Sequence, residues 1–143
     1  MPIEVAWDNE TKTVLRYDIG EYWNWDDFPT AVRNAERMRA EVTHSLDLII
    51  TAQDGMRPPL GFPLSSLIDR TLRSAPDSTC IAVFVGNDHF RNTMTFICRN
   101  LPDNDGICAR LFVTATLEKA RSIIAQRHSQ TADTQVAQAV SEV

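Results

Sequence analysis

Two adjacent serines, Ser65 and Ser66, carry hydroxyl groups at a position where phosphorylation could regulate the protein. They precede apolar residues at helical spacing, and Ser66-x-x-Asp69 has the form of a capping box. A hydroxyl at a helix start satisfies a free backbone N–H group. The same position also favours a phosphate, because free N–H groups and the helix dipole attract anions. We interpret these serines first as helix caps, with a phosphoacceptor as the alternative.

The residue types that usually bind metals form no ligand pattern. The histidines are scattered and match no spacing such as HExxH, and the cysteines form no CxxC pair. These residues are His44, His89, His128, Cys80, Cys98 and Cys108. We therefore expect no metal site and no cofactor, and we expect free buried thiols in a reducing compartment.

No set of residues predicts catalysis. Asp88 and His89 are adjacent, but no serine or cysteine has a spacing that implies contact with this histidine, and no Gly-x-Ser-x-Gly elbow occurs. The five glycines form neither GxGxxG nor a Walker pattern. Asp54, between Gln53 and Gly55, is interpreted as a turn former rather than a receiver-type acceptor, because the chain opens with a hairpin. We expect no enzymatic activity.

Two apolar segments are candidates for a ligand or partner surface. Trp23 and Trp25 lie in an aromatic turn, where they either close the core or form an exposed binding patch. The loop over residues 56–63 contains three prolines together with Met56, Leu60 and Phe62. Large apolar side chains in a stiff loop pack into the core or form a pocket rim or partner face, so this loop is a candidate lid over an apolar ligand. Asp54, just before the loop, belongs to the same candidate surface.

Composition limits the classes of protein. With 143 residues the chain has the length of one domain with a core of its own. A net charge of −5 argues against a broad nucleic-acid-binding surface. No apolar run approaches the roughly 20 residues that a membrane span needs. The first thirty residues are acidic and contain no secretory signal, so we expect a cytoplasmic protein.

Hydrophobic periodicity predicts an α/β domain in the order ββαβαβαβα. Alternating residues predict strands over 3–7 and 13–19, joined by a polar turn, and spacings of three and four predict a helix from Asp27 to about Val42. Beyond it we expect strands at 46–51, 80–86 and 111–115 and helices over 64–75, 87–101 and 116–127. The hairpin supplies an antiparallel pair and the crossovers supply parallel strands, which makes a five-stranded mixed sheet with helices packed against it. The domain spans residues 1–128, and 129–143 is a polar, flexible tail.

Two finer expectations follow from this arrangement. Asp26 or Asp27 should accept hydrogen bonds from free N–H groups in the first turn of the helix, and Pro29 suits a helix start. The strand residues that we expect to be buried are Leu48, Ile50, Val83, Val85, Phe112 and Val113.

The order of elements and several short sequence segments resemble those of the STAS domain, typified by SpoIIAA-like anti-sigma-factor antagonists, and of the related CRAL-TRIO set of small bacterial proteins. The resemblance covers about residues 3–127. It rests on Gly20 and the aromatic turn into Asp26-Asp27-Phe28, on the strands Asp47-Leu-Ile-Ile and Ile81-Ala-Val-Phe-Val-Gly86, and on Leu111-Phe-Val-Thr-Ala-Thr-Leu-Glu118.

The resemblance implies a regulatory module that docks a protein partner and signals without catalysis, with homodimerisation as a further expectation. Family antagonists carry Asp-Ser-Ser/Thr-Gly before the second helix, and a kinase modifies its serine. Here Ser65 and Ser66 follow the insertion 56–63 and have no flanking Asp or Gly. The alternative function is therefore a binding domain for a small apolar or lipid-like ligand under the 56–63 loop.

Overall fold

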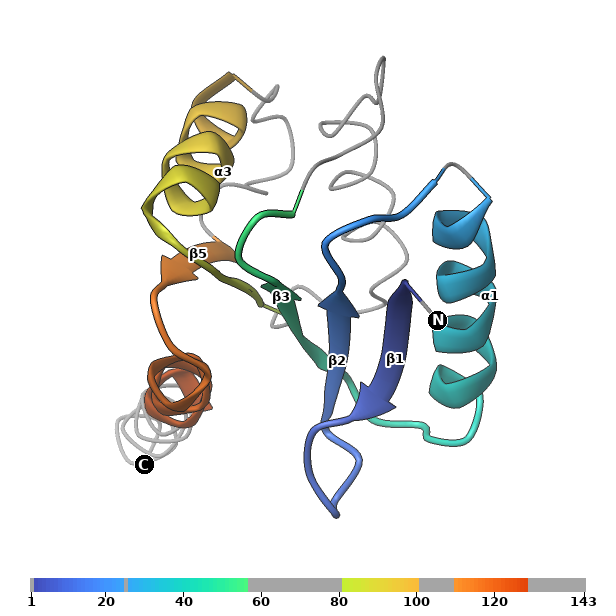
Figure 1. Ribbon diagram of the computed structural model, residues 1–143. Coiled ribbons are helices and arrows are strands. Elements are labelled where there is room, and N and C mark those ends of the chain that lie inside the picture. Colours follow the sequence, from blue (N-terminus) through green and yellow to red (C-terminus); the bar gives the residue numbers. More distant parts are fainter. Residues whose placement is uncertain (1, 25, 57–80, 101–109, 129–143) are drawn as a thin grey trace, which may run out of the picture.

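The computed structural model describes residues 2–24, 26–56, 81–100 and 110–128. Its strands are β1 (Ile3–Trp7), β2 (Val14–Ile19), β3 (Asp47–Ala52), β4 (Ala82–Val85) and β5 (Leu111–Thr114). Its helices are α1 (Asp27–Arg39), α3 (Asp88–Asn100) and a C-terminal helix described over 117–128 (Figure 1). The expected helix over 64–75 and the expected tail over 129–143 lie outside the described residues. None of the described helices combines the length and apolar character that a membrane crossing requires.

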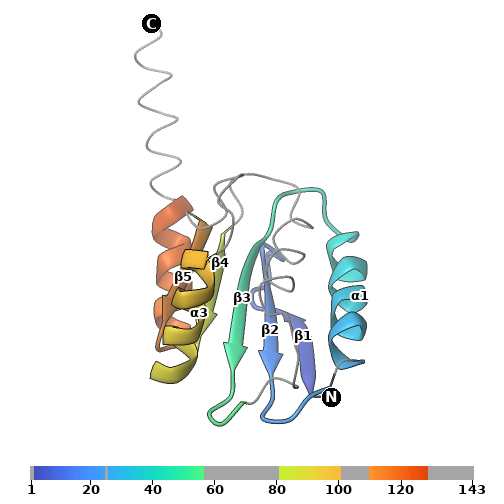
Figure 2. The ribbon, with the colours of Figure 1, turned by 90° about the horizontal axis from the view of Figure 1, so that it is seen from above.

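The five strands form one mixed sheet in the order β1-β2-β3-β4-β5. β1 and β2 are antiparallel, with Ile3 opposite Ile19 and Trp7 opposite Leu15. The remaining pairs, β2 with β3, β3 with β4, and β4 with β5, are parallel. The predicted α/β class, the opening hairpin and the mixed sheet are confirmed, and β3 is the central strand as expected. Figure 2 shows the strands in this order, with α1 beyond β1.

The helices cover the two faces of the sheet unequally. Ala31 and Ala35 of α1 share a core with Phe90 and Met94 of α3, so both helices cover one face, here called the first face. Successive right-handed crossovers that advance in one direction along a sheet leave their helices on the same side. On the opposite, second face, Ala120 and Ile124 of the C-terminal helix pack on strand residues. Figure 1 shows α3 and this helix on opposite sides of β5.

Alternation along the strands explains the two cores. Leu15 and Tyr17 of β2 point to the first face, whereas Val14 points to the second. Four of the six strand residues predicted to be buried are buried, namely Leu48, Ile50, Val83 and Val85. Phe112 is only half-buried.

The prediction for Val113 is wrong, because its side chain is 39% exposed. Val113 lies opposite Phe84 of β4, so both side chains point to the first face. Among the described strands, β5 has one neighbour and lies at the edge of the sheet, and an edge position loses the lateral packing that a central strand receives.

The start of α1 is capped by a residue other than those predicted. Asn24 Oδ1 accepts hydrogen bonds from the backbone N–H groups of Asp26 at 2.9 Å and Asp27 at 3.2 Å. Asp27 Oδ2 in turn accepts the N–H of Asn24 at 2.7 Å, which closes a capping box. Asp26 makes no side-chain cap bond. The amide of Asn24 lies three residues before Asp27, which is the reach that a cap requires.

This geometry predicts that Asn24→Ala destabilises the protein by about 1 kcal/mol, the usual cost of losing a helix cap. Asp26→Ala is the matched control, since it removes a neighbouring side chain without a cap bond, and it should change the free energy of unfolding by less than about 0.5 kcal/mol. Urea unfolding of the three proteins measures both values. An equal loss in both variants would contradict the assignment of the cap.

Candidate functional site

A polar surface lies on the part of the second face that the C-terminal helix does not pack on. Strand alternation brings side chains of β1, β2 and β3 together there with the side chain of Asp8, which directly follows β1, and we call this set the charged shelf. Its members are Glu4, Asp8, Arg16, Asp18 and Thr51. Arg16 and Asp18, from β2, both have side chains that are partly exposed.

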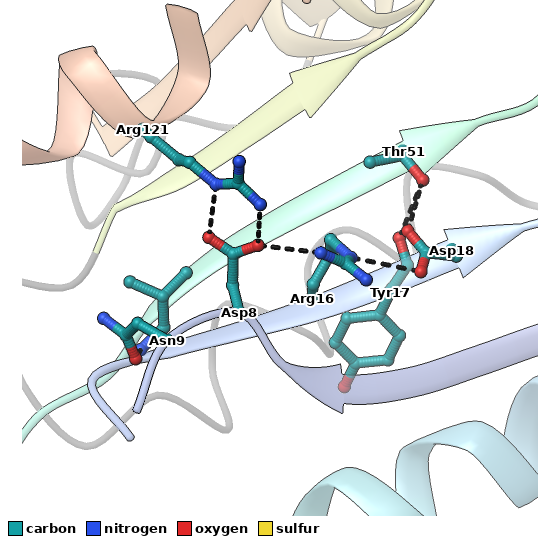
Figure 3. Close-up of polar contacts among 8 residues, drawn as sticks. Asp8, Asn9, Arg16, Tyr17, Asp18, Thr51 and Arg121 are labelled. Atoms are coloured by element: carbon teal, nitrogen blue, oxygen red, sulfur yellow. Dashed lines mark hydrogen bonds and ion pairs between the residues drawn. The ribbon is translucent and has the colours of Figure 1, made fainter. Parts of the chain in front are cut away.

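Hydrogen bonds tie the charged shelf to the C-terminal helix (Figure 3). Asp8 accepts two bonds from Arg121, from Nε to Oδ2 at 2.9 Å and from Nη2 to Oδ1 at 2.8 Å. Arg16 Nη1 donates to the same Asp8 Oδ1 at 2.8 Å. The two parallel bonds from one guanidinium to one carboxylate are the geometry that gives the strongest charge-assisted pairs.

The chain of contacts continues across β2 to β3. Arg16 Nε donates to Asp18 Oδ2 at 3.1 Å, and the Thr51 hydroxyl donates to Asp18 Oδ1 at 2.7 Å. Five side chains from the C-terminal helix, the turn after β1, β2 and β3 are thereby joined, because the links run from Arg121 through Asp8 and Arg16 to Asp18 and Thr51. Side chains that are hydrogen-bonded to one another have already lost rotamer freedom when the protein folds. They do not lose it again when a partner binds, so the surface is preorganised.

These contacts determine the charge state of the Asp8 carboxyl group. The side chain of Asp8 is only 3% exposed. The hydrogen bond from Arg121 lowers the pKa of the Asp8 carboxyl below its ordinary value, with a further contribution from Arg16, and these effects outweigh the opposing effect of burial. Asp8 is therefore ionised at neutral pH and acts as the fixed anion of the shelf.

A hollow of about 340 Å³ lies at one end of the charged shelf. It lies where β2 and β3 end and β1 begins, and ligands in open α/β sheets bind beyond the carboxyl ends of parallel strands. Its lining residues are Pro2, Glu4, Asp18, Ile19, Gly20, Thr51, Ala52 and Gln53. We call it the acidic hollow, because Glu4 and Asp18 are its only charged lining residues in the described ranges.

The two carboxylates of the acidic hollow are direct cross-strand partners, since Glu4 lies opposite Asp18 in the antiparallel register. Asp18 is bonded to Arg16 and Thr51, and its side chain is still 35% exposed. Ionised carboxylates only accept hydrogen bonds, so the hollow suits a donor that carries positive charge, such as an ammonium or guanidinium group. Among the described residues, no group of three or more histidine, cysteine, aspartate or glutamate side chains could hold a metal ion.

The structure places only some of the residues that the sequence singled out. Trp23 is buried in the core of the first face, and its indole Nε1 donates to the sulfur of Met56 at 3.4 Å. Asp54 is exposed in the turn after β3. Met56 is half-buried against the same core. The other candidates, Trp25, Leu60, Phe62, Ser65 and Ser66, lie outside the described residues.

The core position of Trp23 corresponds to the first of the two interpretations of the aromatic turn, closure of the core. Neither Trp23 nor Asp54 lines the acidic hollow.

Tyr17 is a second buried aromatic residue of the first face. Burial raises the pKa of the Tyr17 hydroxyl to about 12, so this phenol stays protonated at neutral pH.

The three histidines have different surroundings. His44 Nε2 donates to the carbonyl oxygen of Lys12 at 2.7 Å. His89 is exposed at the start of α3, where Asn87 Oδ1 caps the helix by accepting the N–H of Phe90 at 2.9 Å. His128 Nε2 lies 2.5 Å from Oδ2 of Asp47. The side chains of Cys80, Cys98 and Cys108 are outside what the structure describes.

Sequence reasoning missed the pairs Asp8–Arg121 and Asp47–His128. Their members are 113 and 81 residues apart in the chain, and neither pair has a local motif. A signal was nevertheless present at Asp47, because an acidic residue at the start of a strand that is apolar on both faces must find a partner if it is buried.

Comparisons with models of protein families, with curated proteins and with solved structures found no match. The resemblance to STAS domains therefore rests on the predicted order of elements and on the short sequence segments named above.

Proposed function

We propose that this chain is a non-enzymatic interaction module of STAS type that docks a protein partner through the charged shelf. The partner inserts a lysine or arginine side chain into the acidic hollow, between Glu4 and Asp18. The observation that carries the proposal is this cross-strand pair of carboxylates at the hollow, on a surface already held in place by the Arg121–Asp8–Arg16–Asp18 chain of contacts.

Charge complementarity favours a basic partner segment. The protein as a whole has a net charge of −5, which attracts a basic partner at long range, and the hollow supplies the local acceptors. Preorganised acceptors favour binding, because few side chains have to be ordered when the partner arrives.

The test is binding of a fluorescein-labelled peptide of alternating arginine and alanine, measured by fluorescence anisotropy at low salt. Glu4→Lys places a cation at the acidic hollow and should weaken binding by about tenfold, since like charges at a contact are strongly unfavourable. Glu10→Lys is the matched control, because it makes the same change of net charge in the exposed hairpin turn, away from the hollow.

The control should retain the affinity of the wild type within about twofold, as expected for a charge outside the contact. An equal loss in both variants would mean that the peptide responds only to overall charge. A matching glutamate–alanine peptide that binds as well as the basic peptide would also contradict the proposal.

A further inference from the structure

The pair Asp47–His128 lies on the second face but does not line the acidic hollow. Asp47 is the first residue of β3, and its side chain is 5% exposed. Its Oδ1 accepts the backbone N–H of Ile81 at 3.1 Å, and its Oδ2 lies 2.5 Å from His128 Nε2. A buried carboxylate that is bonded through both oxygens holds a fixed orientation toward the histidine.

This contact determines which nitrogen of His128 carries the proton. An ionised carboxylate is only an acceptor, so Nε2 must be the donor and carries hydrogen. In the neutral ring the lone pair is then on Nδ1. The ring is 58% exposed, and no contact to Nδ1 occurs within the part of the chain that the structure describes. Among the described residues, the result is a surface imidazole whose Nδ1 lone pair has a fixed orientation and no bonded partner.

In metal sites and in catalytic triads, a carboxylate bonded to one ring nitrogen of a histidine orients the other nitrogen as a ligand or a base. The described residues contain no group of side chains that could hold a metal ion. They also contain no hydroxyl or thiol that is hydrogen-bonded to this ring. Within the part of the chain that the structure describes, the Nδ1 lone pair is therefore open to an external reagent. An anionic acceptor at Nε2 also stabilises the cationic ring that forms when Nδ1 is modified.

We propose that His128 is a phosphoacceptor that takes a phosphoryl group on Nδ1, with Asp47 as its positioning residue. The Nδ1 lone pair forms the new N–P bond while the bond from phosphorus to the leaving group of the donor breaks. The proton on Nε2 stays in place, and the ring becomes a cation that is paired with the Asp47 carboxylate. The modification site is separate from the proposed docking surface, so either proposal can fail alone.

Phosphoramidate is the probe for this reaction, because it is a small phosphoryl donor that releases ammonia and needs no kinase. The three histidines provide internal controls. His44 is bonded through Nε2 to a neutral carbonyl, and His89 is exposed at a helix start. Long-range ¹H–¹⁵N correlation spectra report the tautomer of each ring and the nitrogen that is phosphorylated, and ³¹P spectra report the rate.

We expect His128 to be in the Nε2–H tautomer and to be phosphorylated on Nδ1. We expect its rate to exceed that of His89 by at least about tenfold, the scale on which an oriented carboxylate partner acts. Asp47→Asn should lower the rate at His128 to that of His89 and leave His44 and His89 unchanged. His128→Gln should remove the signal and thereby assign it.

Reaction of His128 at the same rate as His89, or phosphorylation on Nε2, would overturn the proposal and leave the pair as a structural contact only. The tautomer and the site of reaction are read in the wild-type protein, so the test stands even if Asp47→Asn does not fold.

Discussion

Replacing Trp23 with alanine is expected to destabilise the protein by about 3–5 kcal/mol, the range for truncating a large aromatic residue in a core. Trp23 is 8% exposed and belongs to the core between the sheet and the helices of the first face. Its indole N–H also donates to the Met56 sulfur, so the variant loses this contact together with the ring. Urea unfolding followed by circular dichroism measures the difference.

The neighbouring aromatic residue provides the control for this experiment. Tyr22 is 72% exposed, so Tyr22→Ala should change the free energy of unfolding by less than about 0.5 kcal/mol. A loss below about 1 kcal/mol for Trp23→Ala would place the indole outside the core and restore the interpretation of the aromatic turn as a binding patch.

Removal of the charge of Asp8 is the second large effect that we expect. Asp8→Asn replaces a carboxylate that accepts three bonds from two guanidinium groups. Breaking a buried ion pair from one side costs about 3–5 kcal/mol, but Arg121 and Arg16 have side chains that are 51% and 25% exposed and regain water. We therefore expect a loss of about 1–3 kcal/mol at pH 7.

The effect of Asp8 should depend on pH in one direction. Because folding lowers the pKa of Asp8, its carboxylate stabilises the folded protein above the unfolded pKa of about 4, and this contribution is lost as the pH falls through the folded pKa. The difference between wild type and Asp8→Asn should be constant near neutral pH and shrink below about pH 4.

An exposed ion pair provides the control for Asp8. Glu41 pairs with Lys12 at 3.2 Å, and both side chains are about half exposed. Glu41→Gln should cost less than about 0.5 kcal/mol at pH 7. A pH-independent difference between wild type and Asp8→Asn would contradict the role of the Asp8 charge.

The fold was predictable because its determinants are local. Alternation over 3–7 and 13–19 and the apolar run of β3 reflect which faces of a strand are buried, and burial is what shapes such patterns. The cap of α1 was misassigned because several polar residues precede the helix, and only the backbone path selects Asn24 over Asp26. The burial of Val113 was wrongly predicted because the sequence of β5 does not reveal that this strand lies at the edge of the sheet.

The candidate site was much less predictable than the fold. The acidic hollow depends on the register that sets Glu4 opposite Asp18 and on parallel pairing that brings Thr51 beside Asp18. Ion pairs such as Asp8–Arg121 join residues from opposite ends of the chain, and a single sequence contains no periodicity that links them. Charged residues on a hairpin appear merely solvated until their three-dimensional partners are known.

The most direct test of the docking proposal is to map where the arginine–alanine peptide binds on ¹⁵N-labelled protein by NMR. The account predicts saturable shifts of the backbone amides of Glu4, Asp18, Thr51 and Gln53, which line the acidic hollow, with no comparable change on the outer side of α1. Shifts that are centred on α1, or spread evenly over acidic residues of the whole surface, would contradict it.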